Sequence, residues 1–253
     1  MNPLQYRAVR EKVAELDCIL VRPENSAGEP VPPRGLAVFC HGFGAGGDDL
    51  VGLASELLQI AAPTSGLALL FPSAPISLEE QGMPGARAWW LLSLQRLLSA
   101  MEEGRYEQIR EEVPEGIEAS RDMLSATIAT LLDRYAIDES RLLLGGFSQG
   151  AMLAVETACY GLKRPPAQLC LYSGALICEK QWKARASQLA RTLILQSHGK
   201  LDTILPFQTG LWLREMLEAA GSTVDFIEFN GPHTIPQSAI EKTAHMLAQL
   251  IND

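Results

Sequence analysis

The feature that most constrains this chain is residues 145–150, Gly-Gly-Phe-Ser-Gln-Gly, which directly follow the apolar residues 142–144. A short apolar run bounded by glycine is typical of a buried parallel strand, and residues 151–159 are almost wholly apolar and suit a buried helix. A sharp turn between the two would hold Ser148 in a strained backbone conformation with its hydroxyl exposed. Gly146 and Gly150 leave out side chains where strand and helix would crowd each other. The pattern therefore predicts a serine nucleophile at the turn.

The same five-residue pattern has a simpler interpretation. Glycine-rich turns occur by chance, and the serine in such a turn often only caps the next helix. Here strand, turn and helix follow one another in the order that a nucleophilic serine requires, so the order favours the catalytic interpretation.

Apolar strand-like runs alternate with helical patterns along the whole chain. This alternation predicts an α/β fold with a mostly parallel central sheet and helices on both faces. The expected strands are residues 18–21, 36–40, 67–71, 142–144, 169–172, 193–196 and 224–229. The expected helices are residues 50–60, 117–135, 149–159, 208–220 and 237–251. We expect residues 1–253 to form a single domain in which residues 23–35 are a surface loop.

A serine hydroxyl needs a base to remove its proton, and the base needs an acid to orient it. After a turn of this type the acid and then the histidine follow, each behind a later strand. Only His233 lies in a loop directly after the last expected strand, so we expect it to be the base. His41 precedes the serine and His198 ends an earlier strand. His245 lies in the C-terminal helical pattern and is expected on the solvent-exposed surface.

Asp202 is the expected acid, because its loop follows the strand at 193–196 and sites in such sheets form at the carboxyl ends of strands. Asp225 also satisfies the order, but it falls within a strand pattern. A loop aspartate is otherwise commonly a turn or cap residue, and Asp202 stands shortly before an expected helix. Asp202 remains the favoured acid.

Backbone N–H groups must stabilise the negative charge that develops on the acyl oxygen. Gln149 directly follows the nucleophile and supplies one such group. The glycine-rich loop at 41–49 follows an early strand and is expected to supply another. This loop could instead hold a phosphate, but it lacks the lysine and Ser/Thr of a P-loop and the spacing of a dinucleotide-binding turn.

Five motifs stand in order between about residues 36 and 235: residues 41–44 with Asp49, residues 71–75, residues 87–89, residues 146–150, and residues 198–199 with Asp202. Together they resemble the phospholipase/carboxylesterase family of α/β-hydrolases, which includes acyl-protein thioesterases and small bacterial carboxylesterases. The resemblance implies the α/β-hydrolase fold, a catalytic triad of Ser148, Asp202 and His233, and an oxyanion hole formed by the backbone N–H groups of Phe43 and Gln149. It also implies that His198 shapes the loop that presents the acid.

The chain departs from the family pattern in three places. Pro232 stands where the family usually has glycine before the catalytic histidine, and Thr203 replaces the proline common after the acid. The segment between residues 91 and 114 is longer than in compact members. Pro232 is expected to restrict the loop of His233, and the longer segment argues against transferring a family substrate to this chain.

Residues 79–113 interrupt the alternation, and we expect them to form a helical insertion. Apolar positions 90, 91, 94, 97, 98 and 101 follow helical spacing, which favours a helix packed on the domain surface. The insertion is also a candidate cap over the active site, with Trp89, Trp90 and Leu94 as an apolar wall for an acyl chain. A membrane-surface helix is disfavoured, because acidic residues follow where basic ones would be expected.

Composition excludes several classes of function. The net charge of −9, with eight acidic and three basic residues between 102 and 122, argues against nucleic-acid binding; that acidic window is best explained as a solvated helix face. No run of about 18 apolar residues predicts a membrane span, and the first ten residues lack the apolar core of a signal peptide. We therefore expect a cytoplasmic protein without stable membrane insertion.

Cysteine usage points to no dedicated metal site. The five cysteines, at positions 18, 40, 159, 170 and 178, are odd in number and include no close pair at ligand spacing. Free buried thiols are therefore expected rather than disulfides or zinc ligands.

These patterns together predict a serine hydrolase that cleaves carboxylic esters or thioesters through an acyl-enzyme on Ser148. No cofactor and no metal are expected, and the substrate is a small-molecule or acyl-chain ester. The alternatives are a lysophospholipase or peptidase of the same fold, and a non-catalytic hydrolase-like binding protein. The intact set of three catalytic residues argues against the binding protein. The sequence leaves the oligomeric state open, a homodimer included.

Overall fold

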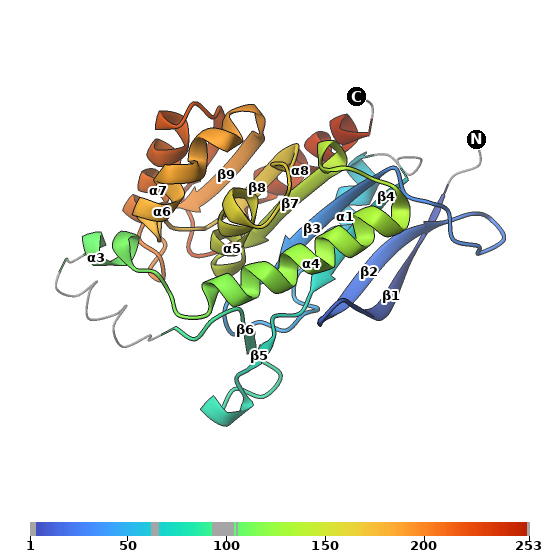
Figure 1. The fold of residues 1–253 in the computed structure, drawn as a ribbon, viewed down its shortest axis with the longest axis horizontal. Coiled ribbons are helices and arrows are strands. Elements are labelled where there is room, and N and C mark those ends of the chain that lie inside the picture. The colour runs from blue at the N-terminus through green and yellow to red at the C-terminus, as the bar shows by residue number, and fades with distance from the viewer. Residues whose placement is uncertain (1–3, 62–65, 93–103, 105, 252–253) are drawn as a thin grey trace.

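The computed structural model describes residues 4–61, 66–92, 104 and 106–251. An eight-stranded sheet runs through its centre in the order β1-β2-β4-β3-β7-β8-β9-β10 (Figure 1). Its strands are β1 (Gln5–Val13), β2 (Leu16–Glu24), β3 (Gly35–Cys40), β4 (Leu67–Pro72), β7 (Leu142–Phe147), β8 (Gln168–Tyr172), β9 (Leu193–Gly199) and β10 (Val224–Phe229). β1 and β2 pair antiparallel, as do β2 and β4, and all other neighbours are parallel. The expected mostly parallel sheet is confirmed.

Helices cover both faces of this sheet. They are α1 (Leu53–Ala61), α3 (Tyr106–Glu111), α4 (Ile117–Tyr135), α5 (Gln149–Tyr160), α6 (Glu179–Arg185), α7 (Phe207–Ala219) and α8 (Gln237–Leu250), with the short 3-10 helices η1 (Glu79–Gln81), η2 (Glu139–Arg141) and η3 (Ala186–Arg191). Within the described residues, every helix is too short or too polar to cross a lipid bilayer.

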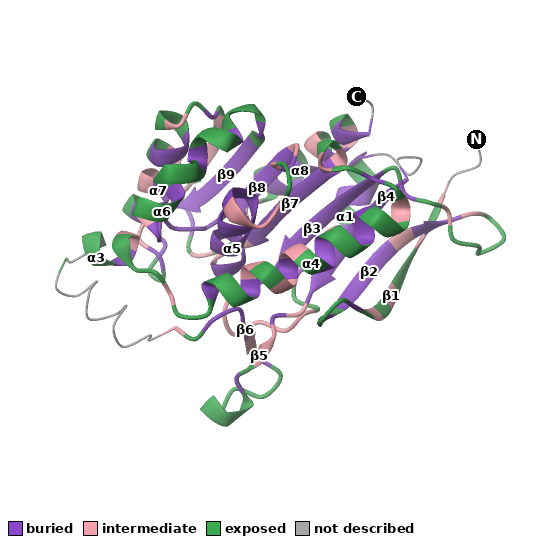
Figure 2. Cartoon of the chain, viewed as in Figure 1, coloured by how far each residue is buried: buried purple, intermediate pink, exposed green. Residues whose placement is uncertain are grey.

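Strand β3 shows why the sheet needs two covering layers. Because side chains alternate along a strand, Leu36 and Val38 point into the core shared with α4, α5 and α7. Ala37 and Phe39 point into the opposite core, which α1 and α8 cover. All six residues of β3 are buried (Figure 2), as expected for a parallel strand between two helical layers.

The structure adds elements that the periodicity did not indicate. β1 pairs along its whole length with β2, yet most of its residues are exposed or half-buried. Such an edge strand carries charged rather than alternating apolar residues, which blunts its exposed edge. Helix α6 was also missed, because its seven residues give no clear apolar period.

The insertion at 79–113 is only partly helical in its described residues. It contains η1, β6 (Arg87–Ala88) and α3. β6 pairs antiparallel with β5 (Ile76–Ser77), which lies just before the insertion, and Figure 1 shows this hairpin projecting beyond the main sheet. The expected helix does not include Trp90 and Leu91, which follow β6 in a bend and an irregular segment. Trp90 is fully buried there, so packing against the core overrides the helical spacing. Positions 94, 97, 98 and 101 lie outside the described residues.

Candidate active site

Ser148 stands at a sharp turn between β7 and α5, with φ 55° and ψ −117°. A non-glycine residue in this region is strained by about 1–3 kcal/mol, and the crowding around it explains why the chain cannot relax. A Cβ at Gly146 would lie 2.6 Å from the Cys40 carbonyl oxygen, and one at Gly150 would lie 2.0 Å from it. The expected roles of both glycines are confirmed.

Asp202 lies in the loop after β9 with its carboxylate buried. Its Oδ1 accepts hydrogen bonds from the backbone N–H groups of Ile204 (2.9 Å) and Leu205 (2.8 Å). Its Oδ2 lies 2.6 Å from Nδ1 of His233. Burial raises the pKa of Asp202, but the hydrogen bonds from His233 and the two amides outweigh it and leave the pKa below its usual range. The carboxylate is therefore charged at neutral pH.

The loop that carries His233 follows β10 and is hydrogen-bonded to the loop that carries Asp202. Lys200 N donates to the Phe229 carbonyl (2.8 Å) and Leu201 N donates to the Gly231 carbonyl (3.0 Å). The two loops approach so closely that a Cβ at Gly199 would lie 2.3 Å from the Gly231 oxygen. This close approach brings together two residues that are 31 positions apart in the chain.

His233 also contacts the turn that carries the serine. Its ring lies 4.7 Å from the ring of Phe147, the residue before Ser148. Because Asp202 occupies Nδ1, Nε2 is the nitrogen left to face a substrate. His233 and Ser148 line the same cavity. The other expected candidate acid, Asp225, is exposed and forms an ion pair with Lys242.

His198 is fully buried next to Asp202. Its Nε2 donates to the Leu205 carbonyl (2.8 Å) and lies 3.4 Å from Asp202 Oδ2. These contacts place it where it holds the turn 202–205 in shape. Burial lowers the pKa of His198. His245 is exposed on α8, as expected.

A buried network holds the glycine-rich loop at 41–49. Ala74 N donates to Nε2 of His41 (3.0 Å), so Nδ1 carries the proton and donates to the Gly42 carbonyl (2.8 Å). Gly44 N donates to the Arg87 carbonyl (2.9 Å), which joins the loop to β6. In the part of the chain that the structure describes, no acceptor is found for the N–H groups of Phe43 and Gln149. Both residues line the cavity.

The side chain of Gln149 has a structural role that sequence reasoning missed. Its Oε1 accepts from Trp89 N (3.0 Å) and its Nε2 donates to the Trp90 carbonyl (2.8 Å). The indole N–H of Trp89 donates to the His41 carbonyl (3.0 Å). Gln149 thus joins the serine turn to the segment after β6. The only sequence signal was its place next to the nucleophile, which drew attention to its backbone alone.

The cavity at Ser148 has a volume of about 540 Å³ and a mostly apolar wall. Its lining residues are Gly42, Phe43, Gly44, Ala45, Asp49, Trp90, Leu92, Ile109, Glu112, Pro114, Phe147, Ser148, Gln149, Met152, Ile177, Ile204, Leu205 and His233. Trp90 is among them, as expected for an apolar wall. Trp89 is not, because its indole is fully buried against the His41 loop. Leu94, the third expected wall residue, lies outside the described residues.

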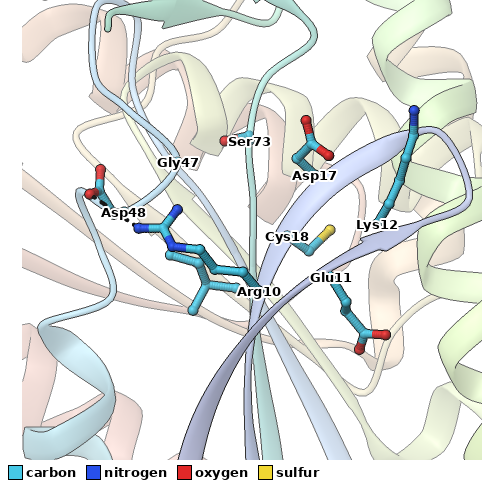
Figure 3. Close-up of a pocket in the computed structure, with 9 residues that line it drawn as sticks. Arg10, Glu11, Lys12, Asp17, Cys18, Gly47, Asp48 and Ser73 are labelled. Atoms are coloured by element: carbon cyan, nitrogen blue, oxygen red, sulfur yellow. Dashed lines mark ion pairs between the residues drawn. The ribbon is translucent and has the colours of Figure 1, made fainter.

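A second hollow, of about 450 Å³, lies between the β1–β2 hairpin and the loops after β3 and β4 (Figure 3). Its wall is mostly charged, and Arg10 pairs with Asp48 across it (3.8 Å). Burial raises the pKa of Cys18 in this hollow to about 12, so the thiol is a poor nucleophile at neutral pH. Ser73 also lines it, but no histidine is among its described lining residues. The candidate nucleophile Ser148, the candidate base His233 and the N–H groups of Phe43 and Gln149 are instead combined in the other cavity.

All five cysteines are buried, as expected. Burial raises the pKa of Cys178, next to the cavity residue Ile177, to about 12. Among the described residues, no three His, Cys, Asp or Glu side chains come together in a way that could hold a metal ion.

Stability should fall as the pH drops below about 6.5, the usual pKa of histidine. Burial lowers the pKa of His41 and of His198, so the unfolded chain binds protons over a range in which the folded chain does not. Each histidine then contributes a loss of at most about 1.4 kcal/mol per pH unit. Urea unfolding at pH 7.5, 6.5 and 5.5 measures the slope of the free energy of unfolding against pH. His41→Gln should flatten it, whereas the exposed His245→Gln should not; equal slopes for all three proteins would contradict the prediction.

The parallel sheet between two helical layers, with a strained serine between β7 and α5, defines an α/β-hydrolase fold. The chain belongs to the phospholipase/carboxylesterase family, whose pattern it matches over residues 27–251.

Individual relatives agree with this assignment. The chain is 27% identical over 231 residues to acyl-protein thioesterase 1 of Mycosarcoma maydis, covering 87% of this chain and 91% of the relative. The solved structure of Zea mays acyl-protein thioesterase 2 superposes with a TM-score of 0.66 at 24% identity, covering 92% of this chain and 98% of that one. The solved structure of a carboxylesterase from Mesorhizobium loti superposes with a TM-score of 0.70 at 17% identity, covering 95% of this chain and 98% of that one. The two structures support the fold.

Proposed function

We propose that this protein is a serine hydrolase of carboxylic esters or thioesters, with Ser148, Asp202 and His233 as its catalytic triad. The observation that carries the proposal is the 2.6 Å bond between Asp202 Oδ2 and His233 Nδ1, made by a histidine that shares its cavity with the strained serine. A buried carboxylate at this position holds the imidazole in the tautomer whose Nε2 can accept a proton.

The reaction proceeds in two halves. His233 takes the proton of Ser148 as its hydroxyl oxygen attacks the acyl carbonyl carbon, and then donates that proton to the leaving alcohol or thiol. The acyl group remains on Ser148 as an ester. In the second half His233 takes a proton from water as the water oxygen attacks the acyl carbonyl carbon. The bond between that carbon and Ser148 Oγ then breaks, the carboxylic acid leaves, and His233 returns the proton to Ser148.

The backbone N–H groups of Phe43 and Gln149 stabilise the oxyanion of each tetrahedral intermediate. Their lack of acceptors among the described residues supports this role. Each such donor contributes roughly 3 kcal/mol to transition-state stabilisation in other enzymes. The buried contacts of His41 and of the Gln149 side chain keep both donors in place before substrate binds.

An acyl chain is the part of the substrate that suits the cavity. Ile109, Met152 and Ile177 come from three separate segments and present apolar side chains to it. The names of relatives, acyl-protein thioesterase and carboxylesterase, agree with an acyl substrate. Burying apolar surface contributes roughly 0.8 kcal/mol per CH₂ group, so each added methylene that fits should increase kcat/KM.

The test is hydrolysis of p-nitrophenyl esters and acyl thioesters of two to twelve carbons, alongside a peptide amide and a lysophospholipid. We expect turnover of the esters and thioesters, with kcat/KM rising with chain length until the cavity is full. Labelling by a fluorophosphonate should be stoichiometric in the folded protein. Absence of both labelling and turnover would favour a non-catalytic binding protein, and turnover of the amide alone would favour a peptidase.

Narrowing the cavity should change chain-length preference more than overall activity. Ile177→Trp places a larger ring in the wall, so we expect kcat/KM for an octanoyl ester to fall at least tenfold more than for an acetyl ester. The ratio of kcat/KM for the octanoyl ester to kcat/KM for the acetyl ester does not depend on how much of the variant is folded, because both values are measured on the same preparation. Ile177→Val is the matched control and should leave that ratio within about twofold. Equal losses for both esters in Ile177→Trp would mean that the acyl chain does not use this wall.

A further inference from the structure

The charged side chains on the wall of the Ser148 cavity are all of one sign. Asp49 and Glu112 line it, and the described part of the wall contains no lysine or arginine. Both carboxylate residues are exposed, so they lie where the cavity opens to solvent. A substrate must therefore pass two negative charges before its acyl chain reaches the apolar interior.

Neither carboxylate is neutralised within the part of the chain that the structure describes. Arg110, two positions from Glu112, instead pairs with Glu179 (2.8 Å) and lies over the ring of Trp212. Arg87, on the hairpin beside the glycine-rich loop, donates to the carbonyls of Ala74 and Pro75. The partners of both arginines are therefore other groups than Asp49 and Glu112.

The chain around Glu112 adds to the negative charge. The exposed glutamates nearby are Glu107, Glu111, Glu115 and Glu118. Residues 93–103 and 105, which the structure does not describe, contain two arginines and two glutamates. Their charges sum to zero, so the net charge of the sequence between residues 93 and 118 remains negative with them included.

The position of Glu112 is set by the backbone. Its carbonyl accepts a hydrogen bond from Cys178 N (2.9 Å), next to the cavity residue Ile177. The segment after α3 is thereby joined to the segment that carries Ile177, and Pro114 also lines the cavity. Glu112 belongs to the cavity rather than to a separate solvated face.

Building on the proposed esterase function, we propose that Asp49 and Glu112 are specificity-determining residues that select substrates by the charge of their leaving group. The enzyme prefers acyl esters and thioesters whose alcohol or thiol portion is cationic over those whose leaving group is anionic. The acyl chain occupies the apolar interior, which leaves the alcohol or thiol portion at the opening beside the two carboxylates.

The expected preference follows from Coulomb's law. A unit charge about 6 Å from one carboxylate in a water-like medium changes binding roughly threefold, with opposite sign for a cation and an anion. One carboxylate therefore separates the two substrates by about tenfold, and two by more. The exposure of both groups means that salt should weaken the effect.

Three butyryl thioesters test the proposal: those of thiocholine, mercaptoethanol and thioglycolate, with cationic, neutral and anionic leaving groups. The quantity measured is the ratio of kcat/KM for the cationic to the anionic thioester at low ionic strength. We expect Glu112→Gln and Asp49→Asn each to lower this ratio five- to tenfold. The matched control Glu107→Gln, on α3 but not on the cavity wall, should change it by less than twofold. Intrinsic differences between the thiols cancel when variants are compared with wild type.

The outcomes separate this inference from the proposed function. The charge selection is overturned if the ratio is unchanged in Glu112→Gln and Asp49→Asn and unchanged by 0.5 M NaCl. If the neutral thioester is still cleaved in that case, the proposed esterase function stands. Cleavage of none of the three overturns both. A ratio that falls in the two variants and in salt, but not in Glu107→Gln, supports the inference.

Discussion

Replacing Ser148 by alanine should lower kcat by about 10⁵-fold or more on every ester and thioester that the wild type cleaves. Removing the nucleophilic serine of a triad has an effect of this size in other enzymes, because no acyl-enzyme can form. The substitution removes only the hydroxyl oxygen and leaves the crowded backbone of the turn unchanged. Release of p-nitrophenol, with active-site titration to exclude trace wild-type enzyme, measures the loss.

Two controls make the Ser148→Ala result specific. The variant should lose fluorophosphonate labelling while its thermal unfolding midpoint stays within a few degrees of wild type. Ser55→Ala, which removes an exposed hydroxyl on α1, should retain full labelling and turnover. If Ser148→Ala kept more than about one thousandth of wild-type kcat, another residue would have to be the nucleophile.

The parallel part of the fold was predictable because its strands are buried on both faces. A strand such as β3 is apolar at every position but its glycine, and flanking turn residues mark its ends. The helix pattern at 117–135 coincides with α4. Edge strand β1 was not predictable in this way, because its stability comes from hydrogen bonds to β2 and not from a buried face.

The placement of the candidate site residues was predictable where local chemistry and chain order coincide. The serine turn requires glycines at fixed positions, and the loops at 202 and 233 follow the strands that a parallel sheet places on one side of β7. The roles of Trp89 and of the Gln149 side chain were not predictable, because they depend on contacts between segments 48 or more residues apart. Apolar spacing indicates that a tryptophan is buried, but not which cavity it faces.

Replacing Asp202 by asparagine should lower kcat by about 10⁴-fold while the fold is retained, as the same change does in a serine protease triad. The asparagine oxygen can still accept the N–H bonds from Ile204 and Leu205, so its NH₂ group then faces Nδ1 of His233. Nδ1 must act as the acceptor, which moves the ring proton to Nε2. An imidazole in that tautomer cannot take the proton of Ser148. Steady-state kinetics at pH 7.5 measures the loss.

Asp225→Asn is the matched control for Asp202→Asn. Asp225 also follows the serine in the chain, but it is exposed and pairs with Lys242. The kcat of Asp225→Asn should therefore stay within about twofold of wild type. Asp202→Ala distinguishes the effect on the His233 tautomer from the support that the side chain gives to its loop. Alanine also leaves the N–H groups of Ile204 and Leu205 without their acceptor, so it should lower the free energy of unfolding by about 1–3 kcal/mol more than asparagine does. If Asp202→Asn remained active while Asp225→Asn did not, the acid of the triad would be on β10, and the short bond between Asp202 and His233 would only position the loop.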